Sequence, residues 1–141
     1  MNFVGSLRAG AAIGAALLVS FACSGGATSD TESSSCAAVA QLTPPVIDRG
    51  IAPLASTPIV QVGDQYFSPT CLTGATGTVT LTLHNGGRLL HNFSVPEQSI
   101  DVDIPAGETV TVKVAVSGKP ISCFCKYHRD VGHKCALLPS A

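Results

Sequence analysis

Four side chains of this sequence are candidate metal ligands, and three of them lie within nine residues. Cys125, His128 and His133 follow the pattern Cys-x2-His-x4-His near the C-terminal end, and His91 lies upstream. Thiolates and imidazoles are soft and borderline ligands that suit transition metals. This spacing, with one distant histidine, is typical of a mononuclear copper site.

One thiol and three imidazoles also make a good zinc set, so zinc remains the alternative metal. Cys123 lies two residues before Cys125 and would share its strand face. It could form a disulfide, remain a buried free thiol or act as a second soft ligand for Cu(I). The sequence contains neither the Cys-x3-Cys spacing of a binuclear copper centre nor the Cys-x-x-Cys-His motif of c-type haem.

Beta strands must position these ligands, because apolar and polar side chains alternate along residues 58–139. In the clearest run, 78–84, Val79, Leu81 and Leu83 share one face and threonines occupy the other. Further short runs, separated by Gly, Pro or Asn turn signals, cover 90–95, 100–104, 110–116, 121–125 and 133–138. Together with the apolar residues that lead from Ile59 into Phe67, they make seven or eight strands, which predict an all-β sandwich or small barrel.

The expected strands place the candidate ligands at strand ends and in one loop. Cys125 ends a strand, His128 follows in a loop, and Gly132 permits a tight bend before His133. His91 can join them only if a Greek-key connection brings its strand end beside this loop. Ligands drawn from a strand end and a distant loop would form a rigid site.

Three motifs resemble the cupredoxin family, in particular plastocyanin-like and amicyanin-like bacterial domains. They are LHNFSV (90–95), IPAGETV (104–110) and FCKYHRDVGH (124–133), and the resemblance covers about residues 58–139. It implies a Greek-key β-sandwich, single-electron transfer and one copper ion bound by His91, Cys125 and His128. The weak axial Met of the family falls at His133, and Met1 is the only methionine of the chain.

A histidine at the axial position would change the copper site. A blue site holds copper in a trigonal plane of two His and one Cys with a long axial contact, and His133 would offer Cu(II) a stronger fourth donor. We expect weakened thiolate charge transfer, a green-to-red colour and a lowered reduction potential.

The rival function is copper storage or delivery without redox cycling, which a strong fourth ligand and Cys123 both favour. With four donors bound no position stays open, so we expect no enzyme activity.

The resemblance also bears on the remaining cysteines and on two polar residues. In the family the strand after the site runs beside the strand at 67–72, which implies a Cys71–Cys135 disulfide. Cys36 would in that case be free or paired with Cys123, and a Cys123–Cys135 bridge stays open as the alternative. Asn92 resembles a structural asparagine near the copper cysteine or is an ordinary turn residue. We expect His84 to face solvent.

The N-terminal part indicates export. Residues 1–22 are typical of a secretory signal, because Arg8 precedes an apolar run at 9–22 that is too short to span a bilayer comfortably. The sequence Ser-Phe-Ala-Cys ending at Cys23 resembles a bacterial lipobox, so we expect Cys23 to be lipidated. Residues 23–57 are expected to form a tether and irregular linker, and 58–141 the copper-binding domain. The six cysteines suit an extracytoplasmic protein, either lipid-anchored at the cell membrane or periplasmic or secreted.

Charge gives limited information about partners. The formal net charge of −1 offers no electrostatic case for nucleic acid or for an anionic membrane surface. Several basic residues lie close in the sequence to the candidate ligands, namely Lys126, Arg129, Lys134 and Arg88. They form a solvated face or a docking patch for an acidic redox protein, whose association would be salt-sensitive. We expect a monomer.

Overall fold

The computed structural model describes residues 34–141, so the expected signal peptide and Cys23 lie outside the described residues. The described part contains one short helix, three 3-10 turns and ten strands, where the sequence predicted seven or eight strands. The helix and strands are α1 (Cys36–Val39), β1 (Ile51–Pro53), β2 (Val60–Gly63), β3 (Tyr66–Ser68), β4 (Cys71–Ala75), β5 (Gly77–Asn85), β6 (His91–Val95), β7 (Ile100–Ile104), β8 (Thr109–Val116), β9 (Ile121–Phe124) and β10 (Lys134–Pro139). The 3-10 turns cover Leu54–Ser56, Pro96–Gln98 and Arg129–Val131. None of the helices within 34–141 is long and apolar enough to cross a membrane.

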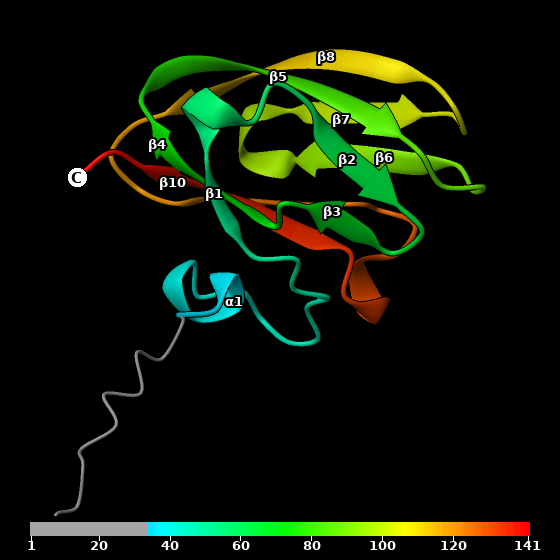
Figure 1. Cartoon of the computed structure of the whole chain (residues 1–141), viewed down its shortest axis with the longest axis horizontal. Coiled ribbons are helices and arrows are strands. Elements are labelled where there is room, and N and C mark those ends of the chain that lie inside the picture. Colours follow the sequence, from blue (N-terminus) through cyan, green and yellow to red (C-terminus); the bar gives the residue numbers. More distant parts are fainter. Residues whose placement is uncertain (1–33) are drawn as a thin grey trace, which may run out of the picture. The chain divides into compact units, whose positions relative to one another are not determined.

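The strands form two sheets that face each other (Figure 1). The six-stranded sheet has the order β1-β4-β10-β9-β6-β7, and the four-stranded sheet has the order β3-β2-β5-β8. The main core takes Leu83 and Val114 from the four-stranded sheet and Phe93 and Leu137 from the six-stranded sheet. Because both sheets contribute to one core, the domain is a β-sandwich.

The alternation seen in the sequence is confirmed in β5. Val79, Leu81 and Leu83 are buried, whereas Thr78 and Thr80 are exposed. The apolar face therefore packs in the core and the threonine face contacts solvent.

Residues 36–57 pack onto the sandwich, although the sequence favoured an irregular linker. Cys36 of α1 forms a disulfide with Cys71 of β4, and β1 pairs in parallel with β4. A second small cluster holds Cys36 and Leu42 against Ala136 and Leu138 of β10. The prolines that argue against a helix follow α1 and do not interrupt it. The folded unit therefore extends further toward the N-terminus than the expected boundary at residue 58.

The two disulfides are Cys36–Cys71 and Cys123–Cys135, so the implied Cys71–Cys135 bridge is wrong. The strand β10 does lie beside β4, but its register places Ala136 opposite Cys71. Successive strand residues point to opposite faces, so Cys135 faces away from Cys71 and toward the main core. There it lies opposite Cys123 on β9. The open alternative is thus the pairing found, and Cys36 is neither free nor paired with Cys123.

Candidate metal centre

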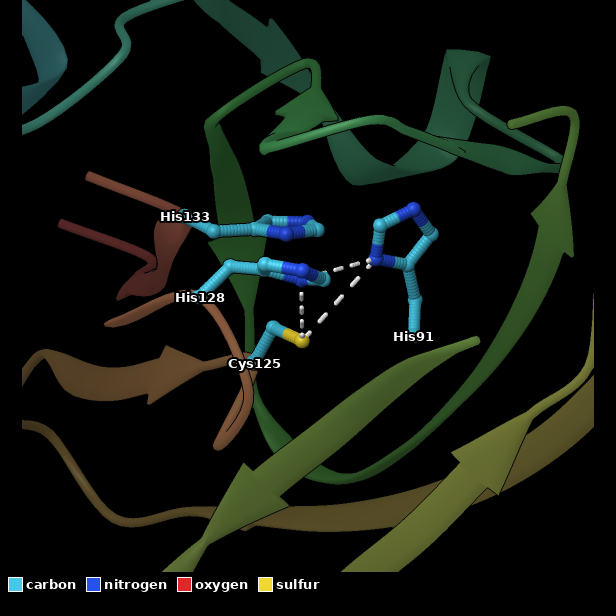
Figure 2. A group of neighbouring side chains, drawn as sticks. All are labelled: His91, Cys125, His128 and His133. Carbon is cyan, nitrogen blue, oxygen red and sulfur yellow. Dashed lines mark hydrogen bonds between the residues drawn. The ribbon is translucent and has the colours of Figure 1, made fainter. Parts of the chain in front are cut away.

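One end of the sandwich brings the four candidate ligands together (Figure 2). His91 is the first residue of β6, Cys125 follows β9, His128 lies in the loop between β9 and β10, and His133 precedes β10. One donor atom from each residue lies within 4.8 Å of the other three. Residues separated by 34 positions in the sequence, His91 and Cys125, thus become neighbours.

The donor atoms converge on one small volume. The sulfur of Cys125 lies 3.5 Å from Nδ1 of His128 and 4.0 Å from Nδ1 of His91. The two Nδ1 atoms are 3.2 Å apart. In Figure 2 the rings of His128 and His133 are stacked and His91 faces them from the other side. The ring of His133 also packs on Phe67, with centroids 4.3 Å apart.

The ligand loop, residues 125–133, is fixed by its own backbone hydrogen bonds and by the segment around Ile47. The amide of Cys125 donates to the carbonyl of His133 (3.0 Å), and the amide of His128 donates to the carbonyl of Cys125 (3.1 Å). Gly132 has a φ of 104°, and a Cβ there would lie 3.0 Å from the amide nitrogen of Ile47. That amide donates to the carbonyl of Gly132 (2.9 Å). The bend before His133 therefore requires glycine, and the segment around Ile47 supports it.

His133 is buried without a hydrogen-bond partner. His91, Cys125 and His133 are inaccessible to solvent, whereas His128 is partly exposed at the edge of the site. Among the buried side-chain nitrogen and oxygen atoms of residues 34–141, only Nδ1 and Nε2 of His133 lack a partner. Leaving such a group unsatisfied costs about 1–3 kcal/mol. A metal ion would provide one ring nitrogen with the missing partner, so the donor set fits a bound metal.

The protonation states also suit metal binding. Burial, reinforced by the neighbouring His91 and His128, lowers the pKa of His133 to about 3. The backbone of Tyr66 faces this ring and opposes the pKa shift, but it does not reach hydrogen-bond geometry. Burial raises the pKa of the Cys125 thiol, against the opposing effect of nearby backbone amides. At neutral pH, therefore, His133 offers a free lone pair, and a metal would displace the thiol proton of Cys125.

The carboxylate of Asp64, which the sequence did not indicate as part of the site, contacts the ring of His91 on the side away from the other ligands. Nε2 of His91 lies 3.1 Å from Oδ1 of Asp64, in the turn between β2 and β3, and Nδ1 of His91 faces the other ligands. Burial lowers the pKa of His91, and the hydrogen bond to Asp64 opposes this effect. The two residues are 27 positions apart, and no sequence spacing links them.

A second group of polar side chains holds the start of the ligand loop against β6 and β7. Asn92 accepts from the amide of Lys126 (3.3 Å) and donates to Asp101 (2.6 Å) and Asp103 (3.0 Å). The ammonium of Lys126 lies 2.8 Å from Asp101 and 3.0 Å from Asp103. The hydroxyl of Tyr127 donates to Asp103 (2.9 Å). Asn92 thus bridges the loop and β7, and Lys126 is charge-paired, which weakens the basic patch expected from the sequence.

Two residues considered from the sequence lie outside the cluster. Cys123 is bound in a disulfide and is not available as a second soft ligand. His84 is partly exposed, and its Nδ1 lies 3.0 Å from the hydroxyl of Thr109. Within residues 34–141, Cys125 is the one cysteine outside a disulfide.

Comparison with known proteins identifies the architecture. No protein-family model matches the chain, and no curated protein matches it significantly. Among solved structures, the Cu(I)-bound metal-binding domain of the Cu(I)-exporting P-type ATPase CopA of Streptococcus pneumoniae D39 has a TM-score of 0.50 at 13% identity, covering 67% of this chain and 90% of that chain. The fold is cupredoxin-like.

Two structures of cupredoxins superpose less closely. A purple cupredoxin from Nitrosopumilus maritimus has a TM-score of 0.46 at 14% identity, covering 59% of this chain and 98% of that chain. A mutant fern plastocyanin has a TM-score of 0.47 at 18% identity, covering 59% of this chain and 99% of that chain. At such identities the similarity describes the fold alone. The expectation of an all-β, Greek-key β-sandwich of cupredoxin type is confirmed, with the difference in strand number given above.

Proposed function

We propose that this cupredoxin-like chain binds one copper ion through His91, Cys125, His128 and His133 and transfers single electrons outside the cytoplasm. The observation that carries the proposal is the buried set of one thiol and three imidazoles, with donor atoms within 4.8 Å of one another. Thiolate suits Cu(I), and imidazole suits copper generally. When bound, copper would supply a one-electron couple between Cu(I) and Cu(II).

The protein would hold the four donors in nearly one arrangement for both oxidation states. Backbone hydrogen bonds fix Cys125 and His133 in the ligand loop, and Asp64 fixes the ring of His91. His128 is the one candidate ligand with a partly exposed side chain, so it offers the shortest path between the site and a partner. With all four donors bound, the metal would have no open coordination position, which supports a carrier rather than an enzyme, because catalytic zinc sites keep one position open.

His133 supports a copper site that is not blue. Its ring is buried, unpartnered and next to the other three ligands, so it is placed to act as a fourth strong donor. A strong nitrogen donor in place of a weak axial one favours Cu(II) and weakens the thiolate charge transfer.

The decisive experiment measures metal content, optical absorption and EPR of the native protein and of His133→Met. We expect one copper per chain, a green-to-red native protein and a shift toward a blue spectrum in the variant. His84→Met is the matched control, since His84 lies outside the cluster, and it should leave the spectrum unchanged. An intense blue band in the native protein would show that His133 is not a strong ligand. Stoichiometric zinc in its place would support the alternative metal.

The second candidate function is copper storage or delivery without redox cycling. A strong fourth ligand favours it, because it would retain the ion tightly. Cys123 no longer adds support, because it lies in a disulfide. Reversible voltammetry with rapid self-exchange supports electron transfer, whereas tight Cu(I) retention with slow exchange supports storage.

Tethering and docking complete the proposal. We infer that residues 1–22 are removed as a signal peptide and that lipidated Cys23 anchors the domain to a membrane. Mass spectrometry of the membrane fraction, with Cys23→Ser as the control, tests this anchor. A redox protein would approach the partly exposed His128, and Arg129 and Lys134 could attract an acidic partner. That association should weaken with increasing salt.

A further inference from the structure

We propose that Asp64 is a positioning residue of the metal site. Its carboxylate directs Nδ1 of His91 toward the other ligands and makes this imidazole a stronger donor to the oxidised ion. The inference rests on the proposed copper function and deepens it, because it names a residue that sets the balance between the two oxidation states.

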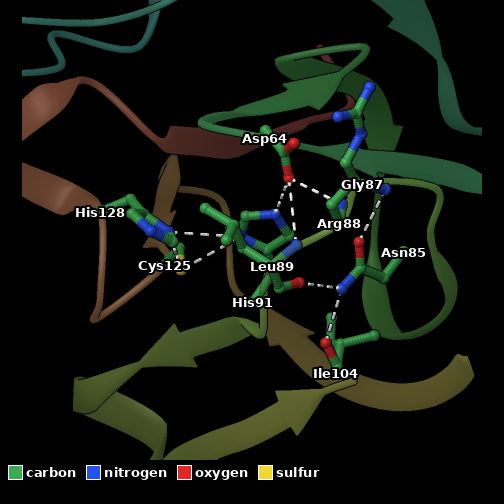
Figure 3. Close-up of polar contacts among 9 residues, drawn as sticks. All are labelled: Asp64, Asn85, Gly87, Arg88, Leu89, His91, Ile104, Cys125 and His128. Atoms are coloured by element: carbon green, nitrogen blue, oxygen red, sulfur yellow. Dashed lines mark hydrogen bonds and ion pairs between the residues drawn. The ribbon is translucent and has the colours of Figure 1, made fainter. Parts of the chain in front are cut away.

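The contact between Asp64 and His91 links a buried ring to a partly exposed carboxylate (Figure 3). The distance from Nε2 to Oδ1 is 3.1 Å, and the side chain of His91 is inaccessible while that of Asp64 is 42% exposed. A proton held on Nε2 leaves the lone pair of Nδ1 free, and Nδ1 is the nitrogen that faces Cys125 and His128.

The carboxylate is itself held in place. Its Oδ1 accepts from the amides of Arg88 (3.0 Å) and Leu89 (3.4 Å), which precede His91 in the chain. A Cβ on Gly87 would collide with this same oxygen, so the close approach requires glycine. The turn after β2 is thereby tied to the loop that leads into β6.

Asn85 fixes the same loop from the core side. Its side chain is fully buried, and its amide donates to the carbonyls of Leu89 (2.9 Å) and Ile104 (2.7 Å). Its oxygen accepts from the amide of Gly87 (2.9 Å). The backbone amides that hold Asp64 are therefore anchored in the core, and the position of the carboxylate is built into the fold.

The expected consequence is electronic as well as geometric. A carboxylate that accepts from a ligating histidine fixes the ring orientation and raises its basicity, and removing such a partner typically changes metal affinity about 10–100-fold. The added negative charge stabilises the more highly charged ion more strongly. Loss of the charge should therefore weaken Cu(II) binding more than Cu(I) binding.

Asp64→Asn tests the charge because the amide oxygen can still accept hydrogen bonds. We expect the ratio of Cu(II) to Cu(I) dissociation constants to rise about tenfold, which corresponds to a midpoint potential about 59 mV higher for a one-electron couple. Asp130→Asn is the matched control: it removes the same charge from the ligand loop, where the side chain is 95% exposed. Equal shifts in the two variants would overturn the proposal.

A measurement without metal keeps the test independent of copper loading. In 15N NMR spectra of the metal-free protein, His91 should carry its proton on Nε2. Gly87→Ala, which displaces the carboxylate, should reduce the population of this tautomer. A native protein with the proton on Nδ1 of His91 would also overturn the proposal. If the native protein binds no copper, the proposed function fails, while the tautomer still shows whether Asp64 orients the ring.

Discussion

The two sheets share one core but differ in what their strands carry. The four-stranded sheet consists largely of alternating strands, such as β8, whose buried residues are valines and whose outward residues face solvent. The six-stranded sheet, with its flanking residues, carries the four candidate ligands and both disulfides. The four-stranded sheet contributes to the site through the turn that bears Asp64 and through Phe67 of β3, whose ring packs on His133.

Burial differs in the same way. All five residues of β6 are buried, among them the polar residues His91, Asn92 and Ser94. Burial of polar groups lowers stability unless each finds a partner, and His133 beside this sheet has none. The four-stranded sheet therefore stabilises the fold mainly by apolar burial. The six-stranded sheet also buries polar ligand residues, and this burial lowers the stability of the fold.

Leu83→Ala should separate stability from metal binding most clearly. Leu83 lies on β5 with no exposed surface, and such a truncation lowers the free energy of unfolding by about 2–5 kcal/mol. The optical spectrum of the folded, copper-loaded protein should not change. Thr80→Ala, on the exposed face of the same strand, is the control for denaturant unfolding. A changed spectrum in folded Leu83→Ala would show that the two sheets are not separable.

Removal of the Cys36–Cys71 disulfide should have the next largest effect. The bond joins residues 35 positions apart, and replacing both cysteines by alanine should lower the free energy of unfolding by about 2–4 kcal/mol. The copper spectrum should persist, because Cys125 is unchanged. The Cys123–Cys135 bond spans only 12 positions, so its chain-entropy contribution is smaller. An unchanged unfolding curve for the Cys36–Cys71 double variant would contradict this expectation.

The long strands of the four-stranded sheet and most ligand-bearing strands were predictable because their signals are local. Alternation marks β5 and β8, and the spacing of Cys125, His128 and His133 marks the ligand loop. The position of His91 depended on the resemblance to cupredoxins. Residue type identifies each candidate ligand, and a period of two identifies each strand. Neither signal tells which distant elements meet in the fold.

The features that the sequence could not reveal depend on register and long-range contacts. Whether Cys71 meets Cys36 or Cys135 is decided by which residue of β10 lies opposite it, and a shift of one residue reverses the answer. Asp64 and His91 meet only when two loops fold together. Residues 36–57 looked irregular because their order comes from a disulfide and from packing rather than from local propensity.

His133→Leu should stabilise the metal-free protein while abolishing the fourth donor. Leucine fills a similar space without an unsatisfied polar atom, so the free energy of unfolding at neutral pH should rise by about 1–3 kcal/mol. Denaturant unfolding of the metal-free variant and native protein measures this gain. A loss of stability would mean that His133 has a favourable partner in the metal-free protein. In the copper-loaded proteins the order should reverse, because the native protein alone keeps all four donors.

The smallest expected effect, taken per pH unit, is a pH dependence that belongs to the site alone. The pKa of His133 is lowered to about 3 in the folded protein by burial and by His91 and His128, while an unfolded histidine has a pKa near 6.5. As pH falls below about 6.5, the unfolded chain binds a proton that the folded site excludes. The metal-free protein should therefore lose about 1.4 kcal/mol of stability per pH unit through His133. The lowered pKa of His91 adds a change of the same sign.

Unfolding curves between about pH 6.5 and 4.5 measure this dependence above the range where most carboxylates titrate. His133→Leu should show a shallower slope, with the contribution of His91 remaining. Leu83→Ala is the matched control from the other sheet: it should lower stability at every pH and keep the native slope, because it removes no titrating group. Equal slopes in the native protein and His133→Leu would show that His133 takes up a proton in the folded state. The stability lost by burying an unpartnered imidazole would then not explain the difference between the two sheets.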